Sequence, residues 1–311
     1  MTLRFDDRVA IVTGAGGGLG RQHALALAAR GARVVVNDLG GSVAGTGGTP
    51  SAALAVVDEI RAAGGQAIAS GASVTDFEAV RAMVDDAMRQ WGRVDILVNN
   101  AGILRDKTFA KMDLADFRLV LDVHLMGAVN CCKAVWDIMR AQNYGRIVMT
   151  TSSTGLYGNF GQSNYGAAKM ALVGLMQTLG LEGARHGIRV NCLAPTAATR
   201  MTENLMPEAV LQLLEPGAVS PGVLALVAED APTRAILCAG AGAFERAHVT
   251  LTRGVFVGHP DDAAEQVLER FDGISDRSGD SVPENGSAQG TLEVDKAMRA
   301  VGGGAQQPAG R

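Results

Sequence analysis

One stretch near the N-terminus decides the fold: Val9–Gly20, which reads VAIVTGAGGGLG. Its first four residues are apolar and predict a buried strand, and the residues from Leu19 to Arg30 predict a helix. The glycines between them let the backbone adopt positive φ and let a ligand approach closely. Such a turn points free amides and the positive end of a helix at a phosphate, so the stretch predicts a dinucleotide site; a plain flexible turn is the alternative.

Short apolar runs and helical stretches keep alternating along the chain. Further strands are expected at 33–37, 67–70, 96–98, 146–150, 189–193 and 235–238, and further helices at 51–63, 76–91, 113–140 and 165–185. Strands that alternate with helices imply right-handed crossovers. The sequence therefore predicts an α/β fold, a Rossmann-like doubly wound parallel sheet of about seven strands with helices on both faces.

Composition excludes several classes of protein. The 311 residues include 28 Lys and Arg against 32 Asp and Glu, for a net charge of −4, and 47% are hydrophobic. Disorder of the whole chain is excluded, and a protein that coats nucleic acid or an anionic membrane is disfavoured. No uninterrupted apolar run approaches about 18 residues, and no signal peptide is recognisable, so we expect no membrane span.

The four cysteines are Cys131, Cys132, Cys192 and Cys238. Their spacing fits neither a disulfide framework nor a metal site, so we expect no metal and a reducing compartment. Together with the richness in Ala and Gly and the excess of Arg over Lys, this favours a bacterial cytoplasmic protein.

Composition shifts near Gly258. We expect residues 1–258 to form one Rossmann domain and residues 259–311 to form a C-terminal extension that is largely flexible from Gly273, because the latter is rich in Gly, Ser, Pro, Asp and Gln. One short helix is expected at Leu292–Val301. A solvated tail and a partner-binding or lid segment are the two interpretations.

Asp38 ends the second predicted strand. A carboxylate at this position can accept hydrogen bonds from the hydroxyls of an adenosine ribose and would repel the 2′-phosphate of NADP. The sequence therefore favours NAD, with a simple turn cap as the alternative.

Tyr165 and Lys169 lie four residues apart on a predicted helix, so both side chains share one face. A free phenol has a pKa of about 10 and is a poor base, but a nearby ammonium and a positive nicotinamide favour the phenolate. Tyr165 could then take the proton of an alcohol while hydride leaves the same carbon. Ser152 follows a strand and could hydrogen-bond the reacting oxygen.

Together these features resemble the short-chain dehydrogenase/reductase family. The matching motifs are Thr13-Gly14-x-x-x-Gly18-x-Gly20, Asn99-Asn100-Ala101-Gly102, Ser152, Tyr165-x-x-x-Lys169 and the Pro195 loop. Longer matches at 99–106 (NNAGILRD), 144–150 (YGRIVMT) and 157–162 (YGNFGQ) are similar to the hydroxyacyl-CoA dehydrogenase domains of peroxisomal multifunctional β-oxidation enzymes and to actinobacterial steroid-degradation relatives.

The resemblance implies a role for each site residue. Ser152 would orient the substrate oxygen, Tyr165 would be the acid/base, and Lys169 would bind the nicotinamide ribose and tune Tyr165. The coenzyme set would be Gly14, Gly18, Leu19, Gly20, Asp38, Leu39, Ser73, Val74, Asn100, Ala101, Gly102, Tyr165, Lys169, Pro195 and Thr196. The substrate wall would be Ser152, Leu156, Tyr157, Phe160, Met201, Leu205 and Met206, with simple core packing as the alternative for its Met and Leu residues.

The chain departs from the family pattern at three positions. Many members have Asn where His124 stands; the role there belongs to a backbone carbonyl, which His also supplies, so no direct acid/base role is expected for His124. Ser73 stands where Asp is common, and Thr196 replaces a glycine. Weaker contact with the adenine is expected at Ser73.

The resemblance implies an NAD-dependent oxidoreductase that interconverts a secondary alcohol and a ketone. The expected substrate is a 3-hydroxyacyl-CoA of fatty-acid or steroid side-chain β-oxidation, with a steroid 17β-hydroxyl as a further substrate. The alternatives are a 3-oxoacyl-thioester reductase of fatty-acid synthesis, disfavoured because that reaction usually uses NADPH, and a non-catalytic NAD-binding scaffold.

The 165–183 helix carries several small residues, which permit close helix packing. Together with the resemblance, they predict a homodimer or homotetramer; packing within one subunit is the alternative.

Overall fold

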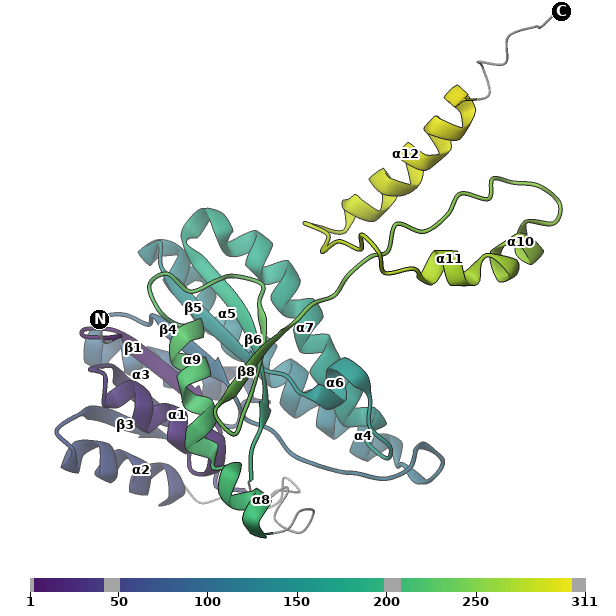
Figure 1. Ribbon diagram of the computed structural model, residues 1–311. Helices are drawn as coiled ribbons and strands as arrows, with labels where there is room; N and C mark the ends of the chain where they lie inside the picture. Colours follow the sequence, from purple (N-terminus) through teal and green to yellow (C-terminus); the bar gives the residue numbers. More distant parts are fainter. Residues whose placement is uncertain (1–2, 42–50, 199–207, 304–311) are drawn as a thin grey trace, which may run out of the picture. The chain divides into compact units, whose positions relative to one another are not determined.

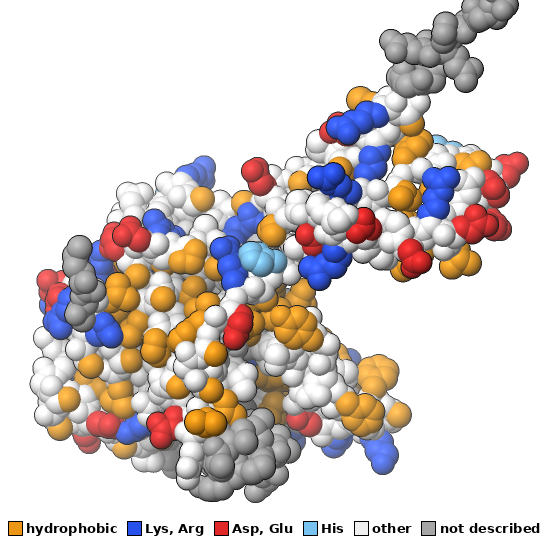
Figure 2. Space-filling view, in the orientation of Figure 1, with side chains coloured by type: hydrophobic (Ala, Val, Ile, Leu, Met, Phe, Trp, Pro, Cys, Tyr) orange, Lys and Arg blue, Asp and Glu red, His pale blue; other side chains and the backbone are white. Residues whose placement is uncertain are grey.

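The computed structural model describes residues 3–41, 51–198 and 208–303. The chain divides into two compact units, 1–247 and 248–311, so the division falls before the change in composition near Gly258. Charges of both signs are interspersed with apolar side chains over the face in Figure 2.

The first unit is built on one eight-stranded sheet with the strand order β3-β2-β1-β4-β5-β6-β7-β8 (Figure 1). Seven neighbouring strands are parallel, as predicted, and β8 is antiparallel to β7. The strands are β1 Val9–Thr13, β2 Arg33–Asn37, β3 Gln66–Ser70, β4 Ile96–Asn99, β5 Gly145–Thr150, β6 Ile188–Thr196, β7 Ile236–Gly240 and β8 Ala243–Ala247.

Helices cover both faces of the sheet, which confirms the predicted doubly wound fold. One face is covered by α1 Gly18–Ala28, α2 Ser51–Ala62 and α9 Ser220–Leu226, and the other by α3 Phe77–Trp91, α5 Gly127–Gln142 and α7 Ser163–Gly183. In β1, Ala10 and Val12 join the first core while Val9 and Ile11 join the second. A central parallel strand is buried on both faces, which is why its sequence is a continuous apolar run.

The remaining elements of this unit are short. They are η1 Phe109–Lys111, α4 Leu114–Leu121, the π-helical turn η2 Asp122–Met126, α6 Ser153–Tyr157, η3 Ala184–His186, α8 Glu208–Leu213 and η4 Pro216–Val219.

The stretch Leu114–Gln142 runs through α4, the π-helical turn and α5. Among the described residues it is the one helical stretch whose length and composition would suffice to cross a membrane. Its side chains Val120, Cys131, Val135 and Met139 are buried in the cores of the fold. This burial accounts for its apolar character.

The second unit is described on its own. It contains α10 Ala263–Glu269, α11 Phe271–Ser275 and α12 Ser287–Gly303, and Leu251 pairs with Ser281 in an isolated antiparallel bridge. The helix expected at Leu292–Val301 therefore lies within the longer α12.

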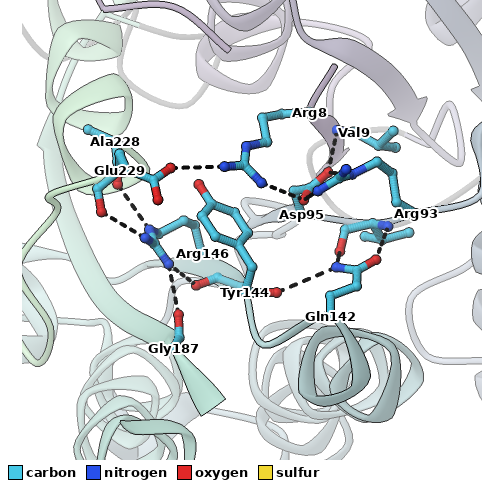
Figure 3. Close-up of polar contacts among 12 residues, drawn as sticks. Arg8, Val9, Arg93, Asp95, Gln142, Tyr144, Arg146, Gly187, Ala228 and Glu229 are labelled. Atoms are coloured by element: carbon cyan, nitrogen blue, oxygen red, sulfur yellow. Dashed lines mark hydrogen bonds and ion pairs between the residues drawn. The ribbon is translucent and has the colours of Figure 1, made fainter. Parts of the chain in front are cut away.

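A polar network joins the amino ends of the central strands (Figure 3). The buried carboxylate of Asp95 accepts hydrogen bonds from the Val9 amide at 2.9 Å, from Arg93 at 2.6 Å and from Arg8 at 3.2 Å. This carboxylate therefore ties β1 to the segment that enters β4, and its charge is paired where it has no access to water.

The ring of Tyr144 lies between two guanidinium groups, with Arg8 at 3.7 Å and Arg146 at 4.2 Å from its centroid. Arg146 in turn donates to the carbonyl oxygens of Gly145, Gly187, Ala228 and Glu229. Cation–π contacts and carbonyl acceptors thus hold the entry of β5 to the segment after α9.

We expect Asp95→Ala to lower the free energy of unfolding by about 3 kcal/mol, because it leaves the Arg93 guanidinium and the Val9 amide without their acceptor and leaves Arg8 with Glu229 alone. Urea unfolding followed by circular dichroism measures the loss. Asp6→Ala is the matched control: Asp6 is 59% exposed and pairs with an exposed Arg4, so its loss should leave the urea midpoint of unfolding nearly unchanged. Equal losses in the two variants would contradict this account of the network.

Candidate active site

The carboxyl ends of the strands open into a cleft where the strand order reverses between β1 and β4. In doubly wound sheets, ligands bind at this point. A cavity of about 340 Å³ lies here. It is lined by most of the predicted coenzyme residues: Gly14, Gly18, Leu19, Asp38, Leu39, Ser73, Val74, Asn100, Ala101, Gly102, Tyr165 and Lys169. Gly20, Pro195 and Thr196 are not among its lining residues.

The turn after β1 needs glycine for two different reasons. Gly14 has φ +63°, and a Cβ there would lie 2.8 Å from the Cα of Ala101. A Cβ on Gly20 would collide with the carbonyl oxygen of Gly14. Gly14 therefore shapes the wall of the cleft, whereas Gly20 lets α1 pack closely against the turn.

Asn100 fixes the position of this turn. Its side-chain amide donates to the carbonyl oxygens of Thr13 at 3.0 Å and Gly14 at 3.1 Å. In return, the Thr13 hydroxyl accepts from the backbone amides of Asn100 at 3.0 Å and Ala101 at 3.1 Å. These hydrogen bonds hold the ends of β1 and β4 together in the ligand-free chain.

Asp38 bonds to the loops on either side of it. One carboxylate oxygen accepts from the Gly16 amide and the other from the Gly40 amide, each at 2.7 Å. The predicted turn cap and the predicted position at the rim of the cleft are therefore both found. A carboxylate has about four acceptor sites, so hydroxyl donors can still bind it.

Two asparagine side chains that the sequence did not indicate hold the opposite wall. Asn37 donates to the carbonyl oxygen of Ala72, and Asn130 to that of Val74, each at 2.9 Å. Beside them, the hydroxyls of Ser73 and Thr75 bond to each other at 2.8 Å. The glycine turn, the Asp38 carboxylate and this wall together fit a dinucleotide.

Ser152, Tyr165 and Lys169 come together at the end of β5. The Lys169 amine donates to the carbonyl oxygen of Thr150 at 2.5 Å and lies 5.4 Å from the centroid of the Tyr165 ring. Ser152 caps α6 by accepting from the Thr154 amide at 3.1 Å, and its side chain is close enough to Tyr165 to lower the pKa of the phenol. The structure therefore places all three predicted residues around one point of the cleft.

In the ligand-free chain, burial is the main cause of the pKa shifts of Tyr165 and Lys169. Burial raises the pKa of Tyr165 above its usual value, although the Ser152 side chain acts in the opposite direction. Burial also lowers the pKa of Lys169 to about 7. In the ligand-free chain, burial outweighs any acidifying effect of Lys169 on the phenol, because both groups are withdrawn from water and a buried amine holds its proton weakly. That Lys169 and a bound nicotinamide together favour the phenolate stays a prediction.

His124 is a cleft residue for which the sequence gave no side-chain role. It lies on the π-helical turn, and its ring meets the Tyr165 ring edge-on, with the centroids 5.3 Å apart. Nε2 lies 3.1 Å from the amide nitrogen and 2.9 Å from the carbonyl oxygen of Ile103. The sequence pointed to this residue only through the family resemblance, because many members have Asn where His124 stands.

The predicted substrate wall is only partly described. Met201, Leu205 and Met206 lie outside the described residues. Tyr157 and Phe160 are 73% and 88% exposed, and Leu156 packs against the core. Outside the predicted coenzyme set, the larger apolar side chains that line the cleft are Ile103, Leu119 and Val123, which the sequence did not single out.

The comparisons place this chain in a known class. The model of the short chain dehydrogenase family matches residues 8–209, and the chain belongs to that family. Members use NAD(P), so the cleft is that of an oxidoreductase. The chain is 54% identical over 228 residues to the peroxisomal multifunctional enzyme type 2 of Drosophila melanogaster, a match that covers 73% of this chain and 38% of that protein. The matched residues therefore span well under half the length of that relative.

Three further matches agree with this family. A putative short-chain type dehydrogenase/reductase of Mycobacterium tuberculosis is 47% identical over 274 residues, covering 88% of this chain and 96% of that protein. The solved structure of the full-length Drosophila enzyme has a TM-score of 0.78 at 37% identity and covers 96% of this chain and 51% of that one. A 7α-hydroxysteroid dehydrogenase solved with NADH has a TM-score of 0.69 at 31% identity, covering 77% and 95%.

Lys169 should make stability depend on pH in the ligand-free protein. Its folded pKa of about 7 lies below its ordinary 10.5, so the stability linked to it is complete above pH 10.5 and is lost as the pH falls towards 7. The pKa of Tyr165 is shifted in the opposite direction, so Tyr165 changes the stability only above its ordinary pKa of 10. From pH 7 to pH 10 the wild type should gain up to about 4 kcal/mol more than Lys169→Met.

Urea unfolding at pH 7 and pH 10 measures this difference. Lys133→Met, which removes an exposed lysine on α5, is the control and should keep the wild-type dependence. An identical pH dependence in wild type and Lys169→Met would show that the buried amine is not destabilised.

Proposed function

We propose that this chain is an NAD-dependent 3-hydroxyacyl-CoA dehydrogenase that oxidises the hydroxyl of fatty or steroid side-chain acyl-CoA substrates, with steroid 17β-hydroxyls as a second substrate class. The observation that carries the proposal is the convergence of Ser152, Tyr165 and Lys169 beside the glycine turn and Asp38. The 54% identity to a peroxisomal multifunctional enzyme supports the acyl-CoA assignment.

The side chains divide the chemistry among them. When bound, NAD⁺ supplies a hydride acceptor and a positive ring. Tyr165 accepts the proton of the substrate hydroxyl, and Ser152 hydrogen-bonds the oxygen that becomes the carbonyl. Lys169 is held by Thr150 within Coulombic reach of the Tyr165 ring, where a protonated amine favours the phenolate.

The cleft wall supports an apolar substrate. Ile103, Leu119 and Val123 present hydrocarbon to the same cavity as Tyr165. An acyl chain or a steroid ring would bury apolar surface there, whereas a sugar would lose hydrogen bonds to water without finding replacements.

Tyr165→Phe tests the assignment of the acid/base. With NAD⁺ and a panel of 3-hydroxyacyl-CoAs and 17β-hydroxysteroids, absorbance at the NADH band should show kcat lowered about 10²–10⁴-fold, because proton transfer loses its acceptor. Tyr144→Phe keeps the ring between Arg8 and Arg146 and should retain the wild-type rate. Wild-type activity confined to sugars or polyols would overturn the substrate assignment. Unchanged physiological function of Tyr165→Phe would support the scaffold alternative, and full dehydrogenase activity of this variant would show that Tyr165 is not the acid/base.

Asp38→Ser tests the choice of coenzyme. Removing the carboxylate should raise kcat/KM with NADP⁺ and lower it with NAD⁺, changing the preference by about 100-fold, equivalent to about 3 kcal/mol. Asp58→Ser on the exposed side of α2 is the control and should leave the preference unchanged. A wild type that already prefers NADP⁺ would instead favour the 3-oxoacyl-thioester reductase.

A homo-oligomer assembled through α7 is also proposed. Met170 and Leu181 are 40% and 48% exposed, and a Cβ at Gly174 would meet nothing within 4 Å. These residues lie on one face of the helix, and the open glycine would allow a helix of a second copy to approach closely.

A further inference from the structure

A second, very small cavity lies behind the cleft. Its volume is about 10 Å³, close to the space that one water molecule needs. It shares His124, Thr150 and Lys169 with the coenzyme cleft, and the residues that line it alone include Asn99 and Leu172. Asn99, His124 and Thr150 are each at most 6% exposed.

Three buried polar atoms lack a partner among the described residues, and the residues that carry them line this cavity. They are Asn99 Oδ1, His124 Nδ1 and Thr150 Oγ1. A fourth such atom, His23 Nε2, belongs to α1, and His23 is not among the lining residues. Buried polar atoms in folded proteins almost always have a protein or water partner. The gathering of three of them around a cavity of this size therefore indicates a ligand.

We infer that Asn99, His124 and Thr150 bind one internal water molecule, and that through this water the side chain of His124 is a positioning residue for Tyr165. Both His124 tautomers satisfy the site. If Nε2 carries the proton, the water donates to Nδ1 and to Asn99 Oδ1 and accepts from the Thr150 hydroxyl. If Nδ1 carries it, the imidazole donates to the water, which then donates to Asn99 and Thr150.

The water completes the restraint on the imidazole ring. Nε2 is already held by the backbone of Ile103, and the water would hold the opposite nitrogen. A ring fixed at both nitrogens keeps its edge-on contact with Tyr165. Burial and the nearby Lys169 hold the pKa of His124 well below its usual value, so the ring is neutral and acts by position rather than by charge. This gives the side chain a role separate from that of the backbone carbonyl.

The direct test is a high-resolution crystal structure of the wild-type chain. A water within hydrogen-bond distance of Asn99 Oδ1, His124 Nδ1 and Thr150 Oγ1 is expected. A cavity without an ordered water, or side chains that pair with one another instead, would overturn the inference.

The kinetic test rests on the proposed function and uses two conservative variants. His124→Gln can still reach Ile103 but has no polar atom where Nδ1 lies, and Thr150→Val removes only the hydroxyl from the cavity. Each should lower kcat about tenfold with the Kd for NADH changed less than about twofold, because only the position of Tyr165 is disturbed. Because both variants release the same water, the double variant should be about as slow as the slower single variant.

Thr150→Ser and His23→Gln are the controls. The first keeps a hydroxyl and should restore the rate, and the second removes a buried imidazole outside this cavity and should leave kcat unchanged. Multiplied effects in the double variant, about 100-fold together, or a parallel loss of NADH affinity, would show independent structural damage and refute the shared water. If the wild type turns over no substrate in the panel, the proposed function fails, and the crystallographic test alone decides the water site.

Discussion

The hydrogen bond from the Lys169 amine to the carbonyl oxygen of Thr150 is the contact on which the candidate site depends. It ties α7 to the end of β5, and the Thr151 hydroxyl returns a bond of 2.6 Å to the carbonyl oxygen of Lys169. Tyr165 lies one helical turn before Lys169, and Ser152 lies just beyond Thr150. Two reciprocal bonds therefore set the mutual position of all three side chains. The same burial that strengthens these hydrogen bonds also lowers the pKa of the Lys169 amine, so the amine holds its proton weakly.

Much of the fold could be predicted because the sequence carries its own periodicity. The parallel strands are buried on both faces, so each appears as an apolar run, and the helices between them end at glycines such as Gly92. Strand β8 could not be predicted in the same way. Its residues are mostly exposed, and its pairing depends on a turn in which Ala241 and Gly242 both have positive φ. The π-helical turn likewise has no periodic signal, since it adds one residue within a continuous helix.

The site was predictable where chemistry demands a residue type at a fixed spacing. Gly14, Asp38, Tyr165 and Lys169 meet that condition. The side chains that hold the cleft open do not, because Asn37, Asn130 and His124 act through backbone atoms brought near only by the fold. The direction of the Tyr165 pKa could not be foreseen either, since it depends on how deeply the ring is buried.

The network around Asp95 and Tyr144 lies at the amino ends of the strands (Figure 3), and the coenzyme turn lies at their carboxyl ends. The charged network therefore holds the strands together at one end of the sheet, and the residues that select the coenzyme lie at the other end. Natural variation in the cleft can retune coenzyme or substrate choice without loosening the scaffold, and variation at the amino edge can adjust thermal tolerance without altering the reaction. The two properties are free to evolve separately within one small sheet.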